Sequence, residues 1–395
     1  VLTQRAAELY RALATSAQGA EAATATKNAD KLTADAGRYE KDVGNLQAAL
    51  AGGISSSAAV GGSSSGKIPQ KSQAEILKII ASVGSSDPDW LASTTLNYPP
   101  TLDLTWTPPV KGTPWNQNKI LGQFIWSTVN ENPGQWKNGV KVMYKVMDVN
   151  KADQPKLVQT YNALARMYFN YFKDYPRAAY WWTKAGNTDN IDLAHCYYQM
   201  GNLDMAKKIL QGYPFDTTGN GDVIIAWGIF GDIDKALKMA ESRMQTNSPD
   251  VGYLLAGDVC RMAGRYDEAL KYYDGFLKLK GNLPQKHKDR AQDGYNTIKY
   301  FNMFDLSKVP DGVYKDSGVG YRGPVESVVT VAGHKITDIK INHREDQFYS
   351  SITDIPARII EKQTIKGIDA CSGATMTSNA IVVGTAKALG NAVKP

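Results

Sequence analysis

Cysteine and histidine are scarce in this chain of 395 residues, which holds three cysteines and four histidines. Cys196, Cys260 and Cys371 lie far apart and form no CxxC or CxxCH pattern. The sequence therefore gives no support to a thioredoxin-type site, a zinc ribbon or c-type haem attachment. The histidines show no metal-ligand spacing, so no metal site is expected. Cys196 and Cys260 are expected to pack within helices as small apolar residues.

Long apolar runs and clusters of basic residues are also missing. The longest apolar stretches, such as residues 223–230, are far too short to span a bilayer. The formal net charge is +6, from 45 basic and 39 acidic residues. The lysines and arginines are spread along the chain and form no run, so nucleic acid is not an expected partner.

The length suggests two or three domains. In residues 1–67, apolar residues at helical spacing predict an N-terminal helical segment, and a Gly/Ser-rich linker follows. Residues 68–117 form a Pro- and Trp-rich segment that is expected to be irregular but well packed, apart from a helix over residues 70–83.

Helical periodicity repeats over residues 118–304. The clearest unit is residues 252–276, where Gly257 and Ala269 are small residues at an expected crossing of two helices. Weaker copies align on the same small position, and the aligned alanines are spaced 28, 30 and 33 residues apart: Ala178, Ala206, Ala236 and Ala269. This pattern resembles the tetratricopeptide repeat. Stacked repeats serve either as a plain scaffold or as a surface that grips a partner protein, and the pattern does not separate the two.

The pattern changes at the start of a C-terminal module, residues 309–395. Two β-branched stretches, residues 325–331 and 336–341, predict a β-hairpin. A helix is expected over residues 351–363, with Pro356 near its first turn, and a final helix over residues 378–389. This arrangement predicts a small α+β domain.

A short polar stretch precedes the final helix. Small residues in it, Gly373 and Ala374, would let a ligand approach the backbone, and four hydroxyls accompany them: Ser372, Thr375, Thr377 and Ser378. The backbone amides that open a helix lack partners within it and favour an anion such as phosphate. Serine and threonine before a helix are nevertheless usually plain caps, and on physical grounds alone the cap is the preferred interpretation.

Residues 311–390 resemble the FMN-binding domain found in a flavin-bearing component of the sodium-pumping NADH:quinone reductase and in its counterpart in Rnf complexes. The similarity runs through residues 311–314, 318–325, the hairpin and residues 343–345, and it closes with DACSGATMTS at 369–378. In that family the pattern S-G-A-[S/T]-x-T marks flavin attachment. A separate flavin transferase esterifies its last threonine with the phosphate of FMN, and here that residue is Thr377.

The resemblance implies that FMN is the cofactor and that Thr377 attaches it but does not catalyse. Asp369 either contributes to recognition by the transferase or serves as a turn or capping carboxylate. Glu345, Tyr321 and Tyr349 are candidates to lie near the flavin ring, and surface or packing roles remain open for each. The rest of the expected cofactor-binding set lies in the same polar stretch: Ser372, Gly373, Ala374, Thr375 and Ser378.

These observations predict a multidomain, mostly α protein with tetratricopeptide-like helical repeats and a small C-terminal α+β FMN-binding domain. The expected function is electron transfer by covalently bound FMN, with the repeats docking a redox partner protein. Two alternatives remain: a repeat scaffold or assembly protein with an unoccupied flavin domain, and a flavin-dependent reductase. No dinucleotide fingerprint or acid–base constellation supports the reductase, so an electron carrier is favoured over a stand-alone enzyme.

The cellular compartment follows by analogy. Flavin attachment in the family generally takes place outside the cytoplasmic membrane, and the chain starts with Val1 in place of Met. We therefore expect an exported bacterial protein, periplasmic or at the cell surface, that could associate with a membrane through a partner or a removed leader.

Overall fold

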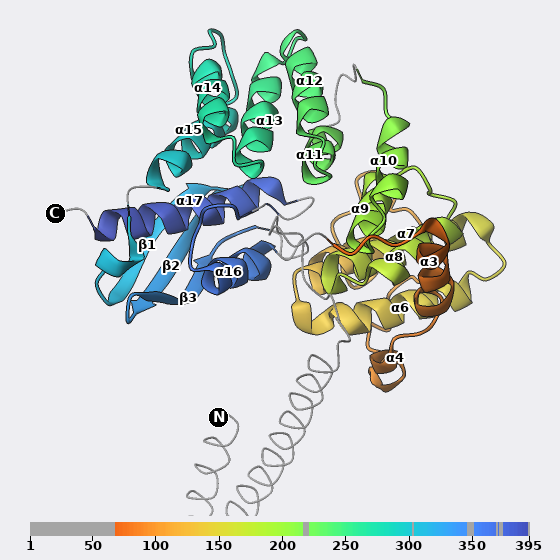
Figure 1. The fold of residues 1–395 in the computed structure, drawn as a ribbon. Coiled ribbons are helices and arrows are strands. Elements are labelled where there is room, and N and C mark those ends of the chain that lie inside the picture. Colours follow the sequence, from red (N-terminus) through yellow and green to blue (C-terminus); the bar gives the residue numbers. More distant parts are fainter. Residues whose placement is uncertain are drawn as a thin grey trace, which may run out of the picture. The chain divides into compact units, whose positions relative to one another are not determined.

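The computed structural model describes residues 68–215, 221–301, 304–345, 351–368, 370 and 374–393. These residues all belong to one compact unit, residues 60–395. The N-terminal helical segment and linker predicted over residues 1–67 lie outside the described residues. The described residues are mostly helical and include one small sheet, which confirms the expected fold class (Figure 1). None of the described helices has the length and apolar character needed to cross a membrane.

The first described helix is α3 (Gln73–Ile79), which continues as a π-helical turn over Ile80–Gly84. A capping box fixes its start, because Ser72 accepts from the backbone N–H of Glu75 and the Glu75 carboxylate accepts from that of Ser72. The short helix α4 (Asp89–Ser93) follows. Together α3 and the π-helical turn account for the helix predicted over residues 70–83.

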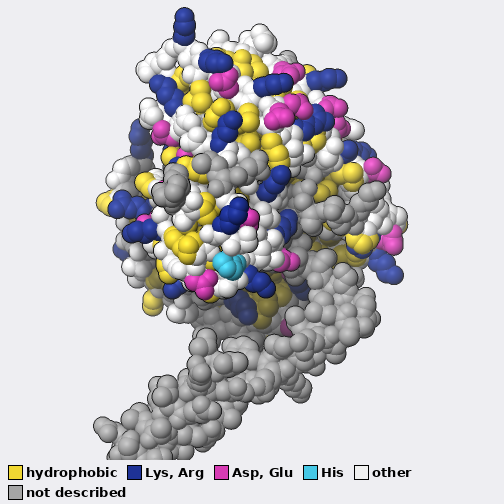
Figure 2. Space-filling view, turned by 60° about the vertical axis from the view of Figure 1, so that its left-hand side comes forward, with side chains coloured by type: hydrophobic (Ala, Val, Ile, Leu, Met, Phe, Trp, Pro, Cys, Tyr) yellow, Lys and Arg dark blue, Asp and Glu magenta, His cyan; other side chains and the backbone are white. Residues whose placement is uncertain are grey.

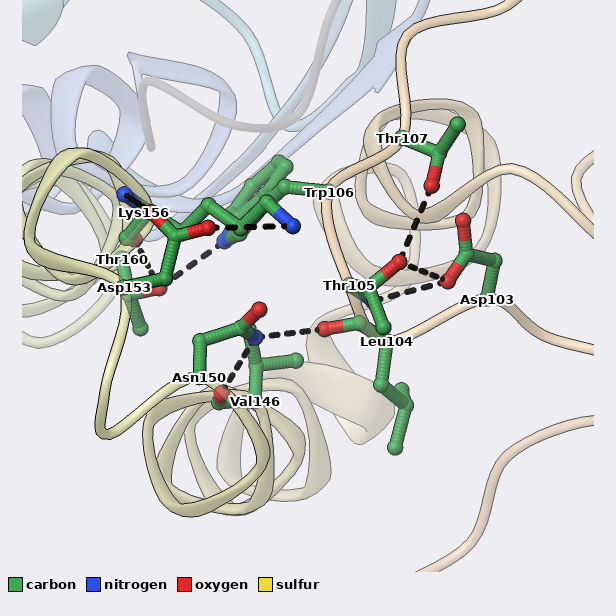
Figure 3. A network of polar contacts seen from close by, with 10 residues as sticks. All are labelled: Asp103, Leu104, Thr105, Trp106, Thr107, Val146, Asn150, Asp153, Lys156 and Thr160. Atoms are coloured by element: carbon green, nitrogen blue, oxygen red, sulfur yellow. Dashed lines mark hydrogen bonds and ion pairs between the residues drawn. The ribbon is translucent and has the colours of Figure 1, made fainter.

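The chain between α4 and residue 120 has no further helix, and side chains of the neighbouring helices hold it in place (Figure 3). Asn150 donates to the carbonyl of Leu104 at 2.8 Å, and the indole N–H of Trp106 donates to the Thr160 hydroxyl, also at 2.8 Å. Within the segment, Asp103 accepts from both the backbone N–H and the hydroxyl of Thr105. Polar contacts to specific atoms therefore replace regular structure here.

Helices that pack against their sequence neighbours make up the middle of the chain (Figure 1). They are α5 (Leu121–Phe124), α6 (Trp136–Val149), α7 (Gln154–Phe172), α8 (Tyr175–Lys184), α9 (Ile191–Gln199), α10 (Leu203–Gln211), α11 (Gly221–Ile229), α12 (Ile233–Met244), α13 (Pro249–Met262), α14 (Tyr266–Leu277) and α15 (Gln285–Tyr300). On the face drawn in Figure 2, lysine and arginine side chains are scattered among acidic and hydrophobic ones and form no single patch.

The aligned small residues of the repeats lie where helices meet. Each is fully buried and lies on the second helix of a pair, in α8, α10, α12 and α14: Ala178, Ala206, Ala236 and Ala269. Gly257 of α13 faces Tyr273 of α14 so closely that an added Cβ would lie 2.5 Å from the ring. Trp181 and Trp182 are buried between helices and contribute to their packing.

The C-terminal module is an antiparallel sheet with two helices. Its strands are β1 (Gly312–Val319), β2 (Pro324–Ala332) and β3 (Lys335–Asn342), in that order, and its helices are α16 (Ser351–Lys362) and α17 (Thr375–Ala392). The helix α17 packs on β1 and β2, and α16 packs on β3. Gly318 makes this close approach possible, because a Cβ there would collide with the backbone of Ala380.

The structure confirms the predicted hairpin as β2 and β3 and changes three details. The strand β1 was not predicted, because glycines and charged residues interrupt its alternation. Pro356 lies inside α16 and not in its first turn; it is buried there, and packing outweighs its missing N–H. The last helix begins at Thr375, three residues earlier than expected, so Thr377 and Ser378 lie within it.

The helix α15, which follows the four helix pairs, lies beside α17 (Figure 1). Asp293 of α15 forms an ion pair with Lys387 of α17 at 3.0 Å and accepts from the backbone N–H of Val319 at 2.9 Å. Arg261 of α13 donates to the side chain of Asn379 on α17. The helices α13 and α15 therefore hold the helix that carries Thr377.

Candidate functional site

Thr377 occupies the first turn of α17, and its side chain is buried. The residue at the N-cap position is Ala374, which has no side-chain group that could accept from the amides of the first turn. Thr375, Thr377 and Ser378 all lie inside the helix, so none of them is the N-cap residue. The plain-cap interpretation of these hydroxyls therefore does not describe Thr377.

The hydroxyl of Thr377 donates a hydrogen bond to the carboxylate of Glu345 at 2.5 Å. Both side chains are nearly inaccessible to solvent, with 6% of Thr377 and 3% of Glu345 exposed. Burial strengthens such a charge-assisted hydrogen bond, because water does not compete for either partner. The pair is a buried hydroxyl with an anionic acceptor already in contact.

Glu345 is held in place by the turn between β1 and β2. Its two carboxylate oxygens accept from the backbone N–H groups of Tyr321 at 2.9 Å and Arg322 at 2.6 Å. Gly320 lies against the same carboxylate, and a Cβ there would be 2.7 Å from one oxygen. A larger residue at position 320 would therefore displace Glu345.

The fold thus brings together Thr377, Glu345 and Tyr321, three residues that sequence reasoning placed at the site. Only the backbone of Tyr321 reaches it. The Tyr321 side chain is 60% exposed, and its ring faces the ammonium group of Lys286, 4.3 Å from the ring centroid. Ala374 and Ser378 are buried at the start of α17, and Thr375 is half-buried. Asp369, Ser372, Gly373 and Tyr349 lie outside the described residues.

A cavity of about 270 Å³ lies at the start of α17, between it and the repeat helices α9 and α11. Its wall includes Thr375 and Ala370 from the C-terminal module and Asp192, His195 and Asp222 from the repeats. Sequence reasoning missed the repeat residues, because nothing in their spacing indicates that they meet the C-terminal module.

Burial shifts the pKa values of Asp192 and His195, two of the titratable residues in the wall of this cavity. Burial raises the pKa of Asp192 to about 6. The charge of Arg166 opposes this increase, and the charge of Asp222 adds to it. Burial lowers the pKa of His195 to about 4, so the imidazole is neutral at pH 7. The cavity therefore carries little positive charge from its own histidine, and Asp192 can exchange a proton near pH 6.

The Thr377 hydroxyl is bonded to a carboxylate, to which a hydroxyl can lose its proton. A phosphate at this oxygen, free or esterified, would meet the same buried carboxylate, and like charges in a poorly solvated place repel each other strongly. The residues present therefore fit a phosphate on Thr377 when Glu345 carries a proton.

The chain was compared with known proteins and protein families. No curated protein and no solved structure matches the chain. Residues 320–390 match the family model of the FMN-binding domain, and this stretch contains Tyr321, Glu345 and Thr377. The C-terminal part of the chain is thus supported as an FMN-binding domain, with FMN as the cofactor of a flavoprotein.

Proposed function

We propose that the protein is an electron-transfer flavoprotein whose FMN is esterified through its phosphate to Thr377. The observation that carries the proposal is the buried Thr377 hydroxyl, hydrogen-bonded to Glu345 within the stretch that matches the FMN-binding domain. The position of Thr377 in the pattern S-G-A-T-M-T supports the same residue. The flavin supplies the electron-accepting chemistry when it is bound, and the chain supplies attachment and orientation.

The helical repeats are proposed to dock a redox partner protein. Their four helix pairs, each anchored by a buried alanine, support the resemblance to tetratricopeptide repeats. The contacts of α15 and α13 with α17 support a role in which partner and flavin are brought close, because the repeats hold the helix that bears Thr377. We further propose that a flavin transferase matures the protein after export from the bacterial cytoplasm.

The intact mass of the chain tests the attachment. Protein produced together with a bacterial flavin transferase is expected to exceed the sequence mass by one FMN less one water. Thr377→Ala should abolish this increment. Thr385→Val is the matched control: it removes another buried hydroxyl from the same helix and should keep the increment.

Each alternative function has its own outcome in this design. A wild-type chain that stays unmodified would contradict the carrier and favour a repeat scaffold with an unoccupied flavin domain. A labelled chain whose flavin is bleached rapidly by NADH or NADPH alone would favour a self-sufficient reductase. The carrier predicts a labelled chain that is reduced by dithionite but only slowly by nicotinamide nucleotides, until a redox partner is added.

A further inference from the structure

We propose that Glu345 is the base that takes the proton from Thr377 when the flavin is attached, an inference that rests on the proposed function. A threonine hydroxyl is a weak nucleophile unless a base activates it. The acceptor chain itself provides such a base, because the Glu345 carboxylate is 2.5 Å from the Thr377 oxygen. That distance is typical of a charge-assisted O–H···O⁻ hydrogen bond, the contact along which a proton is transferred directly.

The surroundings of Glu345 orient it for this task. The N–H of Tyr321 and the Thr377 hydroxyl share one carboxylate oxygen, and the N–H of Arg322 binds the other. Neither backbone N–H gives up its proton to a carboxylate, so of these three partners only Thr377 can transfer one. The carboxylate lies so close to Gly320 that a Cβ there would be 2.7 Å from one of its oxygens. The turn between β1 and β2 therefore holds Glu345 against the hydroxyl.

The reaction balances with a flavin dinucleotide as donor. The Thr377 oxygen forms a bond to the flavin-side phosphorus of flavin adenine dinucleotide. The bond from this phosphorus to the bridging anhydride oxygen breaks, and adenosine monophosphate leaves with the electron pair. The hydroxyl proton passes to Glu345. No electrons are gained or lost, and the flavin remains oxidised.

The same carboxyl group also explains how the product is tolerated. The new phosphodiester is an anion beside a buried group that was a carboxylate, and two such anions repel each other. With the proton of Thr377 on it, Glu345 becomes a neutral hydrogen-bond donor to the ester. Glu345 thus changes from a hydrogen-bond acceptor to a donor when the hydroxyl of Thr377 is converted into the ester.

The test is the rate of flavin attachment to the full chain. Purified protein is mixed with a purified bacterial flavin transferase and flavin adenine dinucleotide, and attachment is followed by in-gel flavin fluorescence and intact mass. Glu345→Gln is expected to lower the rate about 100-fold or more, in the range of general-base effects. Glu361→Gln, which neutralises an exposed carboxylate on α16, should keep the wild-type rate.

The pH dependence separates a base from a purely structural residue. If Glu345 acts as a base, the ratio of the wild-type rate to the Glu345→Gln rate should depend on pH, because glutamine cannot exchange a proton. A structural role would leave this ratio unchanged. The transferase is common to both reactions, so its own titration cancels in the ratio.

A second variant covers the case in which Glu345→Gln folds poorly, as judged by circular dichroism and thermal melting. Glu345→Asp keeps a carboxylate for the N–H groups of Tyr321 and Arg322, but its side chain is shorter by one methylene and lies further from Thr377. Its attachment rate should therefore lie between those of wild type and Glu345→Gln. Attachment at the wild-type rate in either folded variant would overturn the role of Glu345. An unlabelled wild-type chain would instead contradict the proposed function.

Discussion

Asp293 of α15 and Lys387 of α17 form an ion pair that joins α15 to the helix bearing Thr377. Lys387 also donates to the carbonyl of Ser317, and Asp293 accepts from the N–H of Val319, so the pair additionally binds both helices to β1. The side chain of Lys387 is 21% exposed and that of Asp293 is 13% exposed. Such a sheltered pair is costly to break from one side, because the remaining charge loses its partner.

Asp293→Ala should therefore lower the free energy of unfolding by about 2–4 kcal/mol, measured by urea denaturation. Asp148→Ala provides the control, since Asp148 pairs with Lys145 at 3.2 Å on an exposed surface. Exposed pairs contribute about 0–1 kcal/mol. Equal losses in the two variants would show that the contact between α15 and α17 contributes nothing special to stability.

Gly257→Ala should destabilise the repeats by about 1–3 kcal/mol, the usual cost of overpacking a core. Its Cβ would lie 2.5 Å from the ring of Tyr273, which is fully buried and cannot withdraw to solvent. Gly122→Ala in α5 is the matched control, because a Cβ there meets nothing within 4 Å. Thermal melting should show a lower Tm for the first variant and an unchanged or higher Tm for the second.

Asp192→Asn should change how stability depends on pH. Burial raises the pKa of Asp192 from 3.8 to about 6, so ionisation is harder in the folded chain than in the unfolded one. Above pH 6 the wild type bears this cost, and below pH 4 both states are protonated and the cost vanishes. The variant has no ionisation to oppose. It should be more stable than wild type by about 1–3 kcal/mol at pH 8 and equal to it at pH 4.

Urea midpoints of wild type and Asp192→Asn between pH 4 and 8 check this prediction. The difference should grow as the pH rises through the window from 4 to 6 and then level off. A difference that is constant over the whole range would mean that Asp192 ionises normally in the folded protein.

Thr385→Val should leave the protein as stable as wild type or stabilise it by about 1 kcal/mol. Thr385 is fully buried in α17, and its hydroxyl has no hydrogen-bond partner. Valine keeps the branched shape and removes the unpaired polar atom. Thr377→Val is the contrasting change, because it deletes a hydroxyl that is bonded to Glu345. A clear loss of stability in Thr385→Val, seen by thermal melting, would contradict the prediction.

Local patterns in the sequence predicted the elements of the C-terminal module better than its contacts. The β-branched stretches predicted β2 and β3. Buried and half-buried positions alternate along β2, whereas a bulge opposite Thr330 and Val331 breaks the alternation in β3. The strand β1 was not predicted, because it is an edge strand that is only partly buried and contains Gly312, Lys315 and Asp316, which interrupt a strand-like pattern. Its place in the sheet comes from pairing with β2, which no pattern within β1 encodes.

The sequence singled out two residues that the fold brings into contact, but it did not predict how they meet. The resemblance selected Thr377 and Glu345, which are 32 residues apart. Their hydrogen bond depends on how α17 packs across the sheet and on the turn that holds Glu345, and neither can be derived from local spacing. Asp192 and His195 were not predicted at all, because their proximity to Thr375 requires the repeats and the C-terminal module to meet.

The helix α17 makes two separate contacts along its length, one through Thr377 and one through Lys387. Thr377 lies near its start, and Lys387, which is anchored to α15, lies ten residues further on, about 15 Å along the axis. Because the Asp293–Lys387 pair joins α15 to α17, we expect a protein that displaces α15 to displace the helix bearing Thr377 as well. If the proposed flavin is attached to Thr377, its fluorescence should change when such a protein binds.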